Sequence, residues 1–302
     1  MYPYRIQFLN EKQQNLSAVF VDAYIKEIEE WFKDIRDDFD ALWSGVESDS
    51  VYSSIAKEIF TYKSLQRKKD LANYPVGFCY PITQFCFKIL NQKLHENPQH
   101  IVQRYLEEGG VLKIIWGDLR REYFQTAIQL GDWYIDVAYD AIDRSKPKIR
   151  CARFHESDFR DITSFQQYIY IKEPYHKGIM YVNNILPELF PHFPFIFVNS
   201  EGRISIDESE YFGALLEDEG VSVLEDYLLD DSTVKFLDPV QKEKIKSALL
   251  KIGAAYPHIF FLKYRESEVS TLLAKIENEK FFEMPAVLPK VVNNINFILS
   301  LH

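Results

Sequence analysis

Apolar residues between Leu16 and Trp43 recur every three or four positions, which is the spacing of one face of a helix. Charged residues of the same stretch fall on the other faces. The pattern therefore predicts a long amphipathic helix over residues 16–43. A second helix is expected over residues 53–65. The dipeptide Tyr74-Pro75 then interrupts helical structure, because proline disfavours the helical conformation of the residue before it.

The next segment predicts two further helices and then, after Gly110, a change to the hydrophobic period of strands. Gly77-Phe78-Cys79-Tyr80-Pro81 leads into an apolar helical run that extends to about Leu94. Pro81 suits the first helical turn, where its missing N–H leaves no hydrogen bond unmade. A short helix over residues 101–108 should end at Gly109-Gly110. Three strands with a tight turn between the last two are predicted after it, over residues 111–116, 122–130 and 133–138.

The second half of the chain predicts a hairpin followed mainly by helices. The hairpin strands are expected over residues 195–198 and 203–206, joined by a turn that ends at Gly202. Helices are predicted over residues 208–217, 223–229, 239–253, 267–277 and 289–301, and a strand over 258–264. We therefore predict an α+β protein in three parts. The parts are an N-terminal helical region (1–74), an α+β core with the Cys79 helix and the strand ladder (75–150) and a C-terminal α+β lobe (151–302).

Composition narrows the class of protein. Hydrophobic residues make up 47% and charged residues 26%, which excludes a disordered chain. The formal charge of −10 repels phosphate backbones, so we expect no nucleic-acid partner. Three cysteines are too few for a disulfide scaffold, and no apolar run is long enough for a membrane span. These features favour a cytoplasmic protein.

Cys79 is the main candidate for a catalytic residue. A thiol acts as a nucleophile only as its thiolate, and the free N–H groups at a helix N-terminus favour that negative charge. Cys79 directly precedes a predicted helix start, where this effect lowers a thiol pKa. Cys86 lies about two turns inside the same helix among apolar residues, so we expect it to be a core thiol.

The strands after this helix offer partners for a thiol. Tyr123 and Gln125 share one face of the second strand, because side chains alternate along a strand. Asp136 lies in the third strand, which is otherwise apolar. A carboxylate in such a place needs a partner or a function. The turn at Gly131-Asp132 brings the two strands together.

This order of parts resembles the papain-like superfamily, and most closely its transglutaminase-like and arylamine N-acetyltransferase-like branches. In those families a Gly-x-Cys leads a helix, a His opens the next-but-one strand, and an Asp ends the strand after it. Gly77-Phe78-Cys79 fits the first motif, and the segment from Gly131 to Asp136 fits the last. The likeness covers roughly residues 75–140. It implies a cysteine-dependent hydrolase or acyltransferase that uses Cys79 as nucleophile and Asp136 as orienting carboxylate, with a small-molecule acyl substrate.

The sequence departs from the family where the histidine should stand. The segment 121–126 contains no histidine. Tyr123 takes that place, or Gln125 if the strand shifts by two residues. Neither side chain accepts a proton well near neutral pH. Three explanations of this departure are open. The register of the strand differs from the one assumed, a histidine such as His155 or His176 comes from elsewhere in the chain, or the scaffold has lost this chemistry.

Two functional hypotheses follow. The first is a thiol enzyme in which Gln125 is a polar group near the oxyanion or base position. The second is a non-catalytic interaction or regulatory protein on the same scaffold, with an unknown protein as its partner. No histidine pair has the spacing of a zinc site, and no glycine-rich phosphate motif occurs, so we expect neither a metal nor a cofactor.

Overall fold

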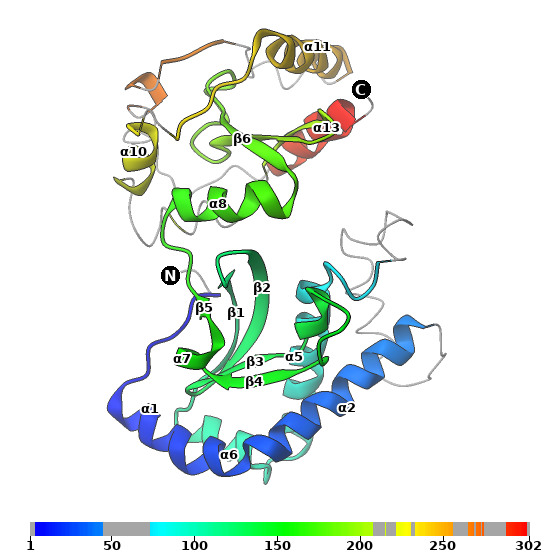
Figure 1. The fold of residues 1–302 in the computed structure, drawn as a ribbon, viewed down its shortest axis with the longest axis vertical. Coiled ribbons are helices and arrows are strands. Elements are labelled where there is room, and N and C mark those ends of the chain that lie inside the picture. The colour runs from blue at the N-terminus through cyan, green and yellow to red at the C-terminus, as the bar shows by residue number, and fades with distance from the viewer. Residues whose placement is uncertain are drawn as a thin grey trace. The chain divides into compact units, whose positions relative to one another are not determined.

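A computed structural model describes residues 4–44, 73–207, 215, 222–230, 233–255, 265–268, 270–272, 274 and 288–300. The chain has a mixed α+β fold with antiparallel sheets (Figure 1). It divides into two compact units, Pro3–Asp161 and Ile162–His302. The three parts predicted from the sequence divide the chain more finely and stay a prediction. The second of their boundaries falls between Arg150 and Cys151, inside strand β4 (Arg150–Arg153).

The Pro3–Asp161 unit contains a curled five-stranded antiparallel sheet (Figure 1). Its strand order is β4-β3-β2-β1-β5. The four strands not yet bounded are β1 (Leu112–Leu119), β2 (Tyr123–Leu130), β3 (Trp133–Asp136) and β5 (Phe159–Arg160). The predicted hairpin at Gly131-Asp132 is confirmed, because β2 pairs with β3 in the register Gln129 opposite Tyr134. Strand β3 ends at Asp136, earlier than predicted, since Tyr139–Ala141 forms a turn of 3-10 helix.

One face of this sheet is covered by helices. Helix α5 (Cys79–Glu96) packs mainly on β2, and α2 (Ile25–Trp43) packs on α5. Apolar side chains of the two helices and of strands β2 and β3 form one buried cluster, which includes Phe39, Phe85 and Ile128. The predicted helix after Pro81 is therefore confirmed and begins at Cys79. Helix α6 (Ile101–Glu107) follows close to its predicted bounds.

The long N-terminal helix is interrupted where the sequence predicted continuity. Helix α1 (Glu11–Leu16) passes into a π-helical turn and a 3-10 turn before α2 begins at Ile25. Ser17 in the π-helical turn accepts a hydrogen bond from the backbone N–H of Asp132 at 3.1 Å. Asp22 accepts another from the indole of Trp133 at 2.8 Å. Contacts with the β2–β3 turn thus accompany the irregular part of the helix.

The Ile162–His302 unit is built on a three-stranded antiparallel sheet of order β6-β7-β8. Its strands are β6 (Gly178–Val182), β7 (Phe195–Asn199) and β8 (Ile204–Ile206). The predicted β7–β8 hairpin is confirmed. Its helices are α8 (Phe165–Tyr175), α10 (Ser222–Leu228), α11 (Pro239–Ala255) and α13 (Leu288–Ser300). Helix α13 packs on β8 and α11 packs on α13, around an aliphatic core.

Several predictions lie outside the described residues. These are the helix over 53–65, the strand over 258–264, most of the helix over 208–217 and part of the helix over 267–277. No helix in the described ranges is both long and apolar enough to cross a membrane.

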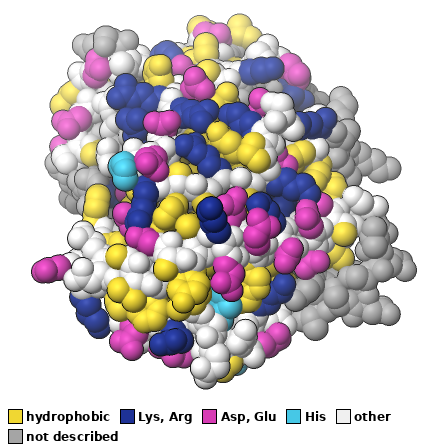
Figure 2. Space-filling model, turned by 60° about the horizontal axis from the view of Figure 1, so that its bottom comes forward, with side chains coloured by type: hydrophobic (Ala, Val, Ile, Leu, Met, Phe, Trp, Pro, Cys, Tyr) yellow, Lys and Arg dark blue, Asp and Glu magenta, His cyan; other side chains and the backbone are white. Residues whose placement is uncertain are grey.

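On the face drawn in Figure 2, basic and acidic side chains are interspersed with hydrophobic ones, so the charge of −10 is not gathered there into one acidic field.

Candidate functional site

The predicted site residues lie on two faces of the same sheet. Cys79, predicted to precede the helix directly, is the first residue of α5, and its Sγ lies 4.0 Å from Oγ1 of Thr126 in β2. Thr83, one turn further along α5, donates a hydrogen bond to the carbonyl of Thr126 at 3.0 Å. Because consecutive strand residues point to opposite faces, Gln125 projects away from the α5 face. Cys79 therefore does not share a face with Gln125.

Asp136 is the centre of a buried hydrogen-bond network. Its Oδ2 accepts bonds from Gln125 Nε2 at 2.7 Å and from Tyr134 Oη at 2.9 Å. Its Oδ1 accepts one from the backbone N–H of Ala138 at 2.9 Å. We call Asp136, Gln125, Tyr134 and Ala138 the Asp136 cluster. The structure thus joins two of the predicted site residues, Asp136 and Gln125.

The Asp136 cluster is closed to solvent. Asp136 and Tyr134 have no exposed surface, and Gln125 is 1% exposed. Burial is the main cause that raises the pKa of Asp136 to about 6, and the three hydrogen bonds oppose this rise. A substrate would have to open the protein core to reach this carboxylate.

The pKa of Cys79 shifts in the direction opposite to the one predicted. Burial among apolar side chains raises it, and this effect exceeds the stabilisation of the thiolate by hydrogen bonds from Thr126. The negative charge of Asp136 raises it further. Position at a helix start does not lower the pKa of this half-buried thiol, because desolvation has the larger effect. Cys86 is fully buried as predicted, and burial raises its pKa to about 12.

The two histidines offered as bases are not joined to Cys79 or Asp136. The side chain of His155 is 75% exposed in helix α7 (Phe154–Ser157), with its Nε2 3.8 Å from Glu156. His176 belongs to the Ile162–His302 unit, where its side chain is exposed. Tyr123, the other residue predicted for the base position, is half-buried at the start of β2 opposite Leu119.

A second buried network escaped the sequence analysis. Arg36 of α2 has no exposed surface, and its guanidinium forms a two-pronged ion pair with Asp140 at 2.8 and 3.0 Å. It also donates to the carbonyl of Val137 at 2.8 Å and to Asp40 at 3.0 Å. Asp40 in turn accepts a very short hydrogen bond from Tyr74. The sequence offered one signal, an arginine on the apolar side of an amphipathic helix.

The arrangement is suited to holding the core together. Arg36 fixes the segment just after β3 against α2, and the Asp136 cluster fixes the end of β3 against β2. An amide such as that of Gln125 neither takes up nor releases a proton at neutral pH.

In the part of the chain that the structure describes, no group of three or more His, Cys, Asp or Glu side chains could hold a metal ion. No family model, curated protein or solved structure matches this chain.

Proposed function

We propose that the chain is a non-catalytic interaction or regulatory protein. In this proposal the Asp136 cluster stabilises the core and takes no part in catalysis. One observation carries the proposal: among the described residues, the Asp136 carboxylate accepts its hydrogen bonds from Gln125, Tyr134 and Ala138, inside a closed core. A carboxylate that orients a catalytic base must bond to that base, and here an amide takes this place.

The pKa and the position of Cys79 also support a non-catalytic role. A nucleophilic cysteine needs a thiolate near neutral pH, and the partial burial of Cys79 raises its pKa above the ordinary value. Gln125 and Cys79 lie on opposite faces of β2, so even a titratable residue at position 125 would point away from the sulfur. The role of this α+β core is then to present its surface to an unidentified protein partner.

Alkylation by iodoacetamide tests this proposal. Labelling of the native protein at pH 7, read by mass spectrometry, should modify Cys79 more slowly than the same residue in urea-unfolded protein. Cys86 serves as a control, because its full burial should protect it in the native state. Selective and faster labelling of native Cys79 would overturn the proposal.

Two variants separate a structural from a catalytic role. Cys79→Ala should leave capture of the partner from a cell lysate unchanged. Gln125→His places an imidazole beside Asp136 and should not speed the labelling of Cys79, because the ring projects from the other face of β2. A large increase in the labelling rate with Gln125→His would contradict the geometry on which the proposal depends.

A cysteine-dependent hydrolase or acyltransferase is the second candidate. One observation favours it: Cys79 is the first residue of α5, at the end where helix amides attract negative charge. In that case the sulfur attacks an acyl carbonyl and forms a thioester while the leaving group departs with the proton. Water or an amine then takes the acyl group and the thiol is restored. Release of p-nitrophenol from p-nitrophenyl acetate should be lost in Cys79→Ala at an unchanged melting temperature.

A further inference from the structure

The outer edge of strand β1, in the Pro3–Asp161 unit, carries backbone groups that no strand pairs. The N–H of Trp116 donates to the carbonyl of Tyr4 at 2.8 Å, outside the sheet. Because backbone groups alternate in direction along an antiparallel strand, the even-numbered residues of β1 face away from β2. Strand β5 pairs only with the last two residues of β1. Among the described residues, no hydrogen bond reaches the outward N–H and C=O groups of Leu112 or Ile114.

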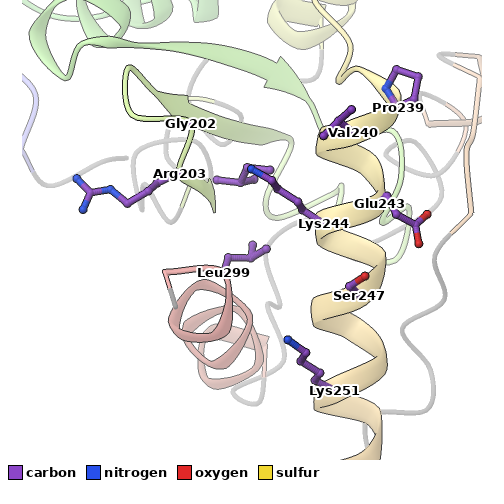
Figure 3. A pocket seen from close by; sticks show the side chains of 10 residues that line it. Gly202, Arg203, Pro239, Val240, Glu243, Lys244, Ser247, Lys251 and Leu299 are labelled. Atoms are coloured by element: carbon purple, nitrogen blue, oxygen red, sulfur yellow. The ribbon is translucent and has the colours of Figure 1, made fainter. Parts of the chain in front are cut away.

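The outer edges of the three-stranded sheet, in contrast, are capped by side chains. In β8 the N–H of Ile206 donates to the side-chain oxygen of Asn296 at 2.7 Å, and the Asn296 amide donates back to the Ile206 carbonyl at 3.0 Å. Helix α13, which carries Asn296, also lines the cavity drawn in Figure 3. In β6 the N–H of Met180 donates to the Glu173 carboxylate at 2.9 Å. Residues 112–114 of β1 have no such cap among the described residues, and an uncovered edge is a template for another strand.

A groove of about 590 Å³ lies beside this part of β1. Lys113 and Ile114 line it from the strand, and Gln84 and Phe87 line it from α5. Ile114 is only 7% exposed, so its unpaired N–H and C=O groups have little access to water in the free protein. Buried backbone groups are costly unless they are paired. The groove therefore offers room for a strand next to groups that need one.

The direction of the side chains decides which strand would fit. Leu112 and Ile114 lie opposite Leu130 and Ile128, whose side chains belong to the core under α5. Residues of an added strand opposite Leu112 and Ile114 would point to the same side, towards the ring of α5 that lines the groove, so apolar side chains suit them. The residue between these two would point to the other face, opposite Lys113.

The charge at this position favours an acidic residue. Burial lowers the pKa of Lys113, and the carboxylate of Asp161 opposes this fall. A further carboxylate opposite Lys113 would favour its charged form. A second copy of this chain fits less well, because antiparallel pairing of two β1 edges through residues 112–114 places the two Lys113 side chains opposite each other. Like charges in directly opposed positions destabilise a strand pair.

We propose that residues 112–114 of β1 bind an extended segment of a partner protein as an added antiparallel strand, with an acidic residue between two apolar ones. The acidic side chain pairs with Lys113, and the apolar side chains enter the groove beside Phe87. The inference goes beyond the proposed function, because it names a surface and the chemistry of its partner. It does not depend on that function, since it uses neither Cys79 nor Asp136.

Fluorescence anisotropy of a fluorescein-labelled peptide, Thr-Val-Glu-Val-Thr, titrated with the full chain tests the proposal. The same peptide with Lys in place of Glu should bind about tenfold more weakly. N-methylation of both valines removes the N–H groups that face β1 and should abolish binding. N-methylation of the Glu is the matched control, because its N–H faces away from β1, and it should leave binding unchanged.

Variants of the protein test the same contacts from the other side. Lys113→Glu should reverse the preference, so that the Lys peptide binds about tenfold more tightly than the Glu peptide, and this gain also shows that the variant is folded. Lys26→Glu is the charge control, because Lys26 is exposed on α2, and it should leave the preference unchanged. In the wild type, the Glu peptide should slow amide hydrogen exchange at Leu112 and Ile114. Exchange at Ile115 should not change, because its N–H already faces β2.

The proposal fails if the Glu peptide does not bind, if the peptide with N-methylated valines binds like its parent, or if Lys113→Glu keeps the original preference. It also fails if exchange at Leu112 and Ile114 slows with rising protein concentration in the absence of peptide, because a second copy of the chain would then occupy the edge.

Discussion

Asp136 should make the stability of the Pro3–Asp161 unit fall as the pH rises from about 4 to 6. Its pKa is about 6 in the folded chain, against an ordinary value of 3.8, so the folded state holds the proton more tightly. The stabilisation is then fully present below pH 3.8 and is lost as the pH rises through 6. The difference between the two values corresponds to about 3 kcal/mol of unfolding free energy.

The perturbation is Asp136→Asn, which removes the titrating group and keeps the size of the side chain. The asparagine oxygen can accept from Gln125 and Tyr134, but its NH₂ group then faces the N–H of Ala138. One unsatisfied buried donor costs about 1 to 3 kcal/mol. The variant should therefore be less stable than the wild type at pH 4, and its stability relative to the wild type should rise by about 2 kcal/mol by pH 7.

Urea unfolding followed by tryptophan fluorescence provides the assay. All four tryptophans of the chain, Trp31, Trp43, Trp116 and Trp133, belong to the unit that contains Asp136, so the signal reports on that unit. Other carboxylates titrate in the same range, so the informative quantity is the difference between wild type and variant at each pH. Asp158→Asn is the control, because Asp158 is exposed and its φ of 58° suits asparagine equally well.

A stability difference that stays constant between pH 4 and 7 would refute the reasoning. It would mean that the carboxylate titrates alike in the folded and unfolded chains, and that burial does not control its ionisation. If the variant instead became less stable relative to the wild type as the pH rises, the three hydrogen bonds would have a larger effect on the pKa of Asp136 than its burial.

Three further outcomes are expected in the same unfolding assay. Arg36→Leu should lower the free energy of unfolding by about 3 to 5 kcal/mol, because it leaves the buried carboxylate of Asp140 without its cation. Replacement of Asp140 by asparagine in the same chain should recover part of this loss. Tyr134→Phe should raise the pKa of Asp136 further, since it removes a hydrogen bond that favours the carboxylate, and the pH-dependent loss of stability should extend to higher pH. Gly131→Ala should cost more than about 1 kcal/mol, because Gly131 has a φ of 60° and an added Cβ would lie 2.4 Å from a side-chain oxygen; an unchanged denaturation midpoint would contradict this.

The sequence predicted the elements whose hydrophobic pattern is strong. Helix α5, the β2–β3 hairpin and helix α11 all lie close to their expected bounds, because a repeated spacing of apolar residues needs no knowledge of distant contacts. Helix α8 and strand β6 were not predicted. Both are short, and Pro174 lies inside α8, so their local patterns are weak.

The candidate site was predictable only in its parts. The alternation of strand residues placed Gln125 on one face of β2, and the helix pattern placed Cys79 at a helix start. Neither pattern says which face of the strand that helix covers. The packing of α5 on the Thr126 face places the thiol and Gln125 on opposite faces of β2, and the ion pair of Arg36 with Asp140 joins residues 104 positions apart.

The sequence by itself determined the α+β class, the helix that follows Gly77-Phe78 and the isolated carboxylate in an apolar strand. These features follow from periodicity and residue chemistry, which act over a few neighbouring positions. Tertiary structure alone decided that Gln125 bonds to Asp136 and that the pKa of Cys79 rises instead of falling. Removal of a group from water depends on everything packed around it, and it outweighs the local field of a helix end.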